Sequence, residues 1–265
     1  MSHTNYFDFY SISDLGLVRV INEDCVASKS HGESHLFVVC DGMGGYNGGD
    51  VASNIAVNSL IEFFDQNVFD DYKVFFDKAI QYVQTKILEG QKSNIQFSSM
   101  GSTLVAIVIK EQKVYYAHVG DSRLYLRRKN KLLQLTKDHS YVQALIDEKI
   151  ISKEEAETHP RKHLLLSALG VELQFTYTIC KKPLIPQNND LLMLCTDGLM
   201  STLSNLQICT LMGGNGSLEQ ITQALLEGAH SEGAPDNTSI IMIKFHSLKE
   251  TKGLVHRILS QIFLA

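Results

Sequence analysis

Four aspartates in this sequence stand beside short apolar runs, in the same local setting: Asp41, Asp121, Asp197 and Asp236. A carboxylate at the mouth of a buried strand is partly desolvated, and this disfavours its charged form. A single aspartate followed by glycine is typical of a turn. Four in this setting, joined by Glu23 and Asp24, have too few cationic neighbours in the sequence to neutralise them. Bound cations balance such a cluster, and oxygen ligands favour Mg²⁺, Mn²⁺ or Ca²⁺ over zinc.

The glycine-rich stretch at residues 41–49 does not fit a nucleotide-binding loop. The pattern G-x-G-x-x-G needs glycine where the sequence has Asn47, and no G-x-x-x-x-G-K occurs. No cysteine is followed by arginine six residues later and no D-x-D occurs, so the thiol and aspartyl-phosphate routes of phosphate transfer are excluded. Direct attack by a metal-activated water remains. Because glycine lets the backbone approach closely, the Gly42 carbonyl is a candidate ligand.

The elements that must position these residues are short strands and two long helices. Six runs rich in Val, Ile, Leu and Tyr predict buried strands: His35–Cys40, Thr103–Lys110, Lys113–Val119, Arg123–Arg127, Leu191–Cys195 and Ser239–Phe245. Apolar residues at helical spacing predict helices over Asp50–Phe64 and Tyr72–Leu88. The short link at Glu111-Gln112 predicts a hairpin. This order favours antiparallel sheets covered by helices over alternating βαβ units.

The composition is that of one ordinary globular domain. Of 265 residues, 44% are apolar and 20% charged, and no repeat or linker divides the chain. The net charge of -5 argues against a nucleic-acid binder. The N-terminus does not resemble a signal peptide, and the longest apolar stretch, Leu104–Ile109, is too short to form a transmembrane segment. Five cysteines without metal or C-x-x-C spacing predict a cytoplasmic protein.

Two charged segments allow more than one interpretation. Residues 138–170 mix charge with short helical stretches, and they fit either a lid beside a site or an exposed helical connection. A basic cluster fits either the solvated tip of a hairpin or a surface that steers acidic substrates: Arg123, Arg127, Arg128, Lys129 and Lys131.

Nine short motifs occur in an order shared by one enzyme family: Gly16–Asp24 (GLVRVINED), Val39–Gly45 (VCDGMGG), Gly101–Thr103 (GST), Val119–Arg123 (VGDSR), Leu135–Ser140 (LTKDHS), His159-Pro160, Ala168–Gly170 (ALG), Cys195–Leu199 (CTDGL) and Asp236–Ser239 (DNTS). On these motifs the chain closely resembles the type 2C metal-dependent protein phosphatases (the PPM family) in their bacterial form. The resemblance implies an α+β fold, a four-layer αββα sandwich in which helices flank two central antiparallel sheets. It also implies a phosphatase domain over residues 1–246.

The resemblance further implies a centre of two Mn²⁺ or Mg²⁺ ions, with room for a third. By correspondence of motifs, Asp41 is expected to bridge the two ions. Asp197 and Asp236 are expected to complete the first metal, and Glu23 and the Gly42 carbonyl to serve the second, partly through water. The implied activity is hydrolysis of phosphoserine and phosphothreonine in proteins by direct attack of a metal-bridging water or hydroxide.

Other residues near the implied centre have roles by the same correspondence. Asp121 matches the position that shares a third, weaker metal with Asp197, and Asp24 is expected to orient metal-bound waters. Arg19 matches the arginine that grips the substrate phosphate, since its planar fork can hold two oxygens. Some members carry a histidine where this chain has Met43, so the acid that protonates the leaving alkoxide is unassigned.

The resemblance assigns residues 138–170 to a flap beside the active site. His163 stands there where asparagine is common, either altering substrate preference or remaining a neutral surface histidine.

Residues 247–265 are expected to form an amphipathic tail that packs on the domain, binds a partner or contacts a membrane surface. Expected partners are phosphorylated proteins and a cognate serine/threonine kinase, with the chain a monomer. Two rival functions are a non-catalytic regulator and a hydrolase of small phosphate esters.

Overall fold

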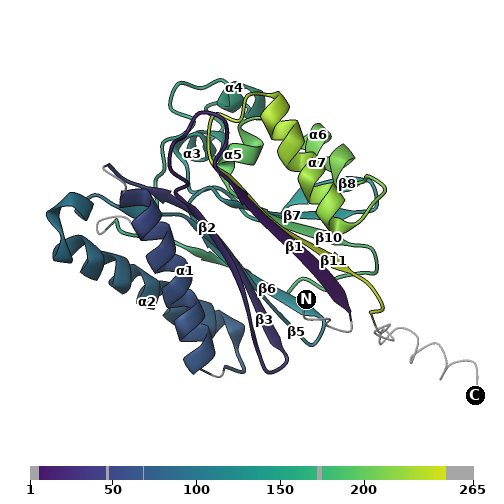
Figure 1. Ribbon diagram of the computed structural model, residues 1–265, viewed down its shortest axis with the longest axis horizontal. Helices are drawn as coiled ribbons and strands as arrows, with labels where there is room; N and C mark the ends of the chain where they lie inside the picture. Colours follow the sequence, from purple (N-terminus) through teal and green to yellow (C-terminus); the bar gives the residue numbers. More distant parts are fainter. Residues whose placement is uncertain (1–5, 46–47, 68, 172–174, 249–265) are drawn as a thin grey trace, which may run out of the picture.

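The structure of the protein is a computed structural model that describes residues 6–45, 48–67, 69–171 and 175–248. Two antiparallel sheets form its centre (Figure 1). Sheet A contains, in spatial order, β1 (Phe7–Asp14), β11 (Thr238–Phe245), β10 (Leu191–Cys195), β7 (Arg123–Arg128) and β8 (Lys131–Gln134). Sheet B contains β2 (Asp24–His31), β3 (Ser34–Met43), β5 (Leu104–Lys110), β6 (Lys113–Val119) and β9 (Thr178–Ile179), and the short β4 (Gly101–Ser102) also pairs with β3.

Helices cover both outer faces of the sandwich, as Figure 1 shows. The helices α1 (Gly48–Gln66) and α2 (Tyr72–Ser93) lie on sheet B, and α6 (Asn205–Leu211) and α7 (Leu218–Ser231) lie on sheet A. Three shorter helices, α3 (Tyr141–Asp147), α4 (Lys153–Glu157) and α5 (Asp197–Met200), gather at one end of the sandwich, and a 3₁₀ turn occupies Ile95–Phe97. The predicted four-layer sandwich is therefore confirmed.

The continuous apolar runs arise because the central strands are buried on both faces. In β3, Leu36, Val38 and Cys40 pack beneath α1 and α2. The alternate residues Phe37 and Val39 point into the core between the sheets. The strand β10 divides its side chains in the same way between the inter-sheet core and the layer under α6 and α7. Successive side chains of a strand point to opposite faces, so both sets must be apolar here.

Local signals explain where the helices begin. The Asp71 side chain accepts a hydrogen bond from the Lys73 N–H and caps α2. Ser217 and Gln220 form a reciprocal capping box at the start of α7. The six predicted strands and two predicted helices are all present, with bounds that differ by a few residues.

The edge strands β1 and β2 and the helices α6 and α7 have no counterpart among the predicted elements. Sequence patterns did not reveal β2, because it lies at the edge of sheet B and its sequence, DCVASKSH, carries few large apolar residues. No helix in the described part of the chain is both long and apolar enough to cross a membrane. The predicted tail lies outside the described residues beyond position 248.

Residues 138–170 connect the two sheets and contain α3 and α4. At the start of this segment, the Arg123 guanidinium pairs with Asp138, with a shortest N–O distance of 2.7 Å. At its end, Leu169 exchanges backbone hydrogen bonds of 2.9 and 3.1 Å with Ser102. One interpretation of the basic cluster placed Arg123 at the solvated tip of a hairpin. The structure instead shows Arg123 paired with Asp138, where it anchors this segment. Arg128 is likewise held, 2.6 Å from the buried Asp190 carboxylate.

Candidate active site

The side-chain alternation of β3 turns Asp41 toward the space between the sheets, on the same face as Phe37 and Val39. Asp24 is the register partner of Asp41 on β2 and shares that face. The Asp41 carbonyl accepts from the Thr103 N–H at 2.8 Å, and the Thr103 hydroxyl accepts from the Asp41 N–H at 2.9 Å. Two strands of sheet B thus place a pair of carboxylates at the end of the inter-sheet core.

Sheet A brings Asp197 and Asp236 to the same region through the ends of β10 and β11. The Thr196 N–H donates to the Ser239 carbonyl at 3.1 Å and extends the pairing of these strands. A Cβ atom at Gly198 would collide with the Asn237 carbonyl oxygen. Glycine after Asp197 is therefore required by this close backbone contact, and the interpretation as a simple turn is insufficient.

The turn from β6 to β7 contributes Asp121 and passes from one sheet to the other. Gly120 adopts φ +89°, a conformation that favours glycine, and a Cβ there would contact Thr103 at 2.7 Å. The Thr103 hydroxyl also lies 2.7 Å from the Ser122 hydroxyl. Thr103 thereby links the Asp41 backbone to the turn that carries Asp121.

Burial and neighbouring carboxylates raise the pKa of Glu23, Asp24, Asp41 and Asp121. Burial, followed by the charges of Asp24 and Asp197, raises the pKa of Asp41 well above its ordinary value. Burial is the largest cause at Asp24 and Asp121 too, and it raises the pKa of each to about 7. The pKa of Glu23 is also raised, again chiefly because burial disfavours its charged form. The described structure thus brings together the acidic residues predicted for the metal centre.

Two basic side chains, Arg19 and His163, reach the cluster from distant parts of the chain. The Arg19 guanidinium lies 2.8 Å from the Asp236 carboxylate. His163 places Nδ1 3.8 Å from the Asp197 carboxylate, and the proximity of this carboxylate raises the pKa of the histidine. His163 is therefore a surface histidine that also borders the cluster, with its side chain 63% exposed.

The donor set suits hard divalent cations. Among the described residues, Asp24 Oδ1 is buried without a hydrogen-bond partner, while Oδ2 accepts from the Thr196 hydroxyl at 2.8 Å. An unpaired buried carboxylate oxygen is costly unless a further group satisfies it. All the charged donors are carboxylates, the ligands that Mg²⁺ and Mn²⁺ favour. In the described ranges no three acidic, histidine or cysteine side chains already enclose a metal position, so the individual ligand roles stay predictions.

Tight backbone packing surrounds the second predicted ligand pair, Glu23 and Gly42. The Gly42 N–H donates to the Glu23 carbonyl at 3.0 Å. A Cβ at Gly42 would collide with the Gly49 carbonyl, and a Cβ at Gly49 would collide with the Glu23 carboxylate. Gly42 and Gly49 therefore let β2, β3 and the start of α1 approach one another closely, and this accounts for these two glycines without a nucleotide.

Two residues that hold the site together were not singled out by sequence reasoning, although both lie in the quoted motifs. Thr103 supports Asp41 as described above. The buried Asn237 amide donates to the Leu15 and Ile21 carbonyls at 2.9 and 3.0 Å, and its oxygen accepts from the Glu23 N–H at 2.8 Å. This one side chain fixes both ends of the loop that carries Arg19. The only sign of its importance in the sequence was that Asn237 directly follows Asp236.

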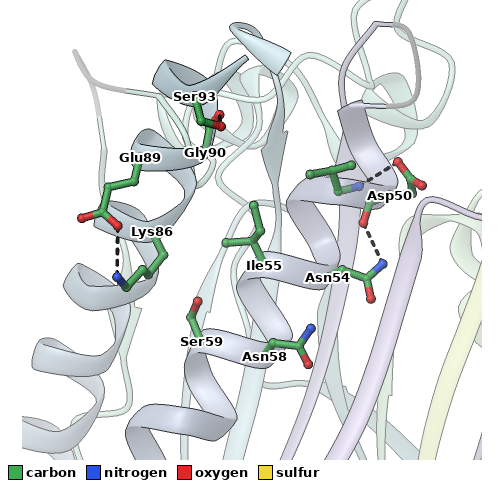
Figure 2. A pocket seen from close by; sticks show the side chains of 10 residues that line it. Asp50, Asn54, Ile55, Asn58, Ser59, Lys86, Glu89, Gly90 and Ser93 are labelled. Atoms are coloured by element: carbon green, nitrogen blue, oxygen red, sulfur yellow. Dashed lines mark hydrogen bonds and ion pairs between the residues drawn. The ribbon is translucent and has the colours of Figure 1, made fainter. Parts of the chain in front are cut away.

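A separate groove of about 660 Å³ lies between α1 and α2 (Figure 2). Its lining is mixed, with the Lys86–Glu89 ion pair at 3.0 Å on α2 and Asp50 and Asn54 on α1. None of the predicted metal ligands lines it. The groove therefore does not belong to the carboxylate cluster.

Comparison with known proteins agrees with this geometry. The profile of the protein phosphatase 2C family matches residues 19–236. The serine/threonine phosphatase stp of Listeria welshimeri is 35% identical over 237 residues, covering 88% of this chain and 93% of that protein. The crystal structure of the Mycobacterium tuberculosis serine/threonine phosphatase PstP/Ppp has a TM-score of 0.81 and 32% identity, covering 91% of this chain and 99% of that one.

A structure of the catalytic domain of PstP in complex with two manganese ions has a TM-score of 0.79 and 31% identity. It covers 91% of this chain and 99% of that chain. Sequence, fold and the convergence of acidic residues from both sheets therefore agree. The chain belongs to the protein phosphatase 2C family.

Proposed function

We propose that this protein is a metal-dependent protein serine/threonine phosphatase that hydrolyses phosphoserine and phosphothreonine. The observation that carries this proposal is the cluster of carboxyls at one end of the two sheets, in which burial and neighbouring carboxylates raise the pKa of Asp24, Asp41 and Asp121. The relatives named as serine/threonine phosphatases support the same reaction. Phosphorylated proteins are accordingly the substrates.

The carboxylates are proposed to hold two Mn²⁺ or Mg²⁺ ions and a weaker third. Asp41 would contribute to holding both ions, Asp197 and Asp236 would hold the first, and Glu23 and the Gly42 carbonyl would hold the second. The raised pKa of Asp41 and the close packing of Glu23 against Gly42 support this division. Such ions, when bound, activate water for attack on phosphorus and stabilise the charge that develops.

Side chains around this centre bind the substrate and orient the reacting groups. Arg19 is proposed to hold the substrate phosphate, and Asp24, held by the Thr196 hydroxyl, would orient water at the metal centre. Asp121, supported through Ser122 and Thr103, is proposed to hold the third ion together with Asp197. Met43 has no proton to give, so protonation of the leaving alkoxide falls to another group.

The wider organisation is proposed as follows. Residues 1–246 form the phosphatase domain, residues 138–170 its flap, and residues 247–265 an amphipathic tail. A cognate serine/threonine kinase supplies the substrates, and the chain acts as a monomer because it provides the whole carboxylate cluster itself. All five cysteines are free, which supports a reducing, cytoplasmic setting.

The full chain with Mn²⁺ is expected to hydrolyse p-nitrophenyl phosphate and a phosphothreonine peptide, and excess EDTA should abolish both activities. Release of p-nitrophenol and of inorganic phosphate measures them. Undiminished activity in EDTA would contradict the metal mechanism. Hydrolysis of p-nitrophenyl phosphate alone would favour a small-ester hydrolase, and metal binding without any hydrolysis would favour a non-catalytic regulator.

Replacing Arg19 by alanine is expected to raise KM for a phosphopeptide by about tenfold, with a smaller change in kcat. The reason is that an arginine holding a phosphate contributes a charge-assisted hydrogen bond to substrate binding. Arg19→Lys retains the charge without the planar fork, so its KM should lie between those of the wild type and of Arg19→Ala. Steady-state kinetics measure the effect. A fall in kcat at constant KM would show that Arg19 does not bind the ground-state phosphate.

A further inference from the structure

The loop after β1 exposes three apolar side chains around Arg19. Leu17, Val18 and Val20 are 61%, 66% and 89% exposed, although single exposed apolar residues are common on protein surfaces. Here they occupy three of four consecutive positions, and the fourth is the proposed phosphate ligand. We call these three residues the valine rim.

The backbone of this loop is held in place by a set of hydrogen bonds. The Leu17 N–H donates to the Ala234 carbonyl at 2.9 Å, and the Gly16 N–H donates to the Asp14 carboxylate at 2.8 Å. The Asn237 side chain binds the loop at both ends, as described above. The loop is therefore anchored on both sides of Val18 and Val20, which are exposed to solvent. A surface organised in advance loses little conformational entropy when it binds a partner.

The position of Arg19 ties the valine rim to the substrate site. Its guanidinium lies on the Asp236 carboxylate, at the edge of the cluster. Consecutive Cα atoms are about 3.8 Å apart, so Val18 and Val20 lie directly beside the residue that would hold the phosphate. An extended peptide advances about 3.4 Å per residue. The residues next to a bound phosphoserine or phosphothreonine would therefore come within reach of both valines.

A second exposed apolar pair borders the cluster from the flap. Leu164 and Leu166 are 47% and 41% exposed, and they follow His163, which reaches Asp197. The Leu166 N–H donates to the His139 carbonyl at 2.8 Å, and the His139 N–H donates to the Gly120 carbonyl at 3.0 Å, next to Asp121. We call Leu164 and Leu166 the leucine rim. The carboxylate cluster thus has a basic side chain with apolar neighbours on each of two sides, Arg19 with the valine rim and His163 with the leucine rim.

We propose that the valine and leucine rims bind apolar side chains within two residues of the phosphorylated serine or threonine, so that the protein prefers substrates with apolar flanking residues. This inference rests on the proposed function. A phosphopeptide is the occupant that fits because the apolar surface is continuous with a site whose Arg19 complements a phosphate. The Arg19 guanidinium lies 2.8 Å from the Asp236 carboxylate of the cluster, and this favours a phosphopeptide over a second copy of this chain or a lipid surface.

Two phosphothreonine peptides test the inference with the full chain and Mn²⁺. One carries leucine or valine at the two positions on each side of the phosphothreonine, and the other carries serine there. The wild type is expected to show a kcat/KM about tenfold higher for the apolar peptide, the discrimination that a small apolar contact provides. In Val18→Ser/Val20→Ser this ratio should fall to about twofold or less. Leu164→Ser should reduce it partially.

Leu206→Ser is the matched control, because Leu206 is 78% exposed on α6 over sheet A. Its peptide ratio should equal that of the wild type. A wild-type ratio near one, or an unchanged ratio in Val18→Ser/Val20→Ser, overturns the inference. So does a dimer in sedimentation experiments that the double substitution dissociates, since a second copy would then be the occupant. Failure of the wild type to hydrolyse even p-nitrophenyl phosphate would instead contradict the proposed function.

Discussion

Replacing Asp197 by alanine is expected to lower kcat/KM for Mn²⁺-dependent hydrolysis of p-nitrophenyl phosphate by at least about 10³-fold, as loss of one member of a catalytic unit does. Asp197 begins α5 directly beyond β10, and it faces the site from sheet A. Its charge contributes to the raised pKa of Asp24, Asp41 and Asp121, so it interacts with every other buried aspartate of the cluster. Its loss should therefore affect more than one ion.

Asp70→Ala is a suitable control for this substitution. Asp70 is exposed before the start of α2, and its replacement should leave kcat/KM within about twofold of the wild type, as surface substitutions usually do. Circular dichroism and the thermal midpoint would show that Asp197→Ala is folded, and titration with Mn²⁺ would report its metal affinity. Activity of Asp197→Ala within tenfold of the wild type would show that Asp197 is not part of the catalytic centre.

Metal-free protein is expected to gain stability when Asp121 is replaced by asparagine, and to gain it chiefly at high pH. Burial raises the pKa of Asp121 to about 7, above its ordinary value of 3.8. The stability associated with this raised pKa is fully present below pH 3.8 and is lost as the pH rises through about 7. Removing the charge should then raise the free energy of unfolding by roughly 2–4 kcal/mol at pH 8 and by under about 1 kcal/mol at pH 4.

Urea denaturation in EDTA at the two pH values measures this difference. Asp70→Asn, at an exposed position, should change the free energy of unfolding little at either pH. Asp24 is not a clean alternative, because its carboxylate accepts a hydrogen bond from Thr196 that asparagine would disturb. An equal gain for Asp121→Asn at pH 4 and pH 8 would indicate that packing, and not the buried charge, determines the effect.

Much of the fold could be predicted because burial on both faces leaves a strong trace in the sequence. The runs at Leu191–Cys195 and Leu104–Lys110 are continuous and apolar because each strand separates two cores. The edge strand β2 has one open side and a mostly polar sequence, so the same reasoning did not find it. Hydrophobic periodicity reports how deeply an element is buried, and it weakens where the burial is partial.

The candidate site was predictable for a related reason. An aspartate at the end of a buried apolar run must lie near the end of the core, so Asp41 and Asp197 could be identified before any contact was known. In the structure Asp41 lies within β3, after its apolar run, and Asp197 lies two residues beyond β10. The nine motifs then gave each acidic residue an expected role. The residues that support the acidic cluster could not be identified from the position of strand ends or from the motifs. Thr103 and Asn237 carry small polar side chains whose importance lies in the backbone atoms they bind.

By itself, the sequence determined which residues end the buried strands, that the cluster lacks nearby charge compensation, and which family the motifs indicate. Only the tertiary structure decided which distant groups meet there. Arg19 contacts Asp236 and His163 approaches Asp197 because strand order and sheet packing bring segments far apart in the chain to one end of the sandwich. Local patterns of polarity record the burial of each segment, but pairing between segments depends on the complete topology, and no short stretch of sequence contains it.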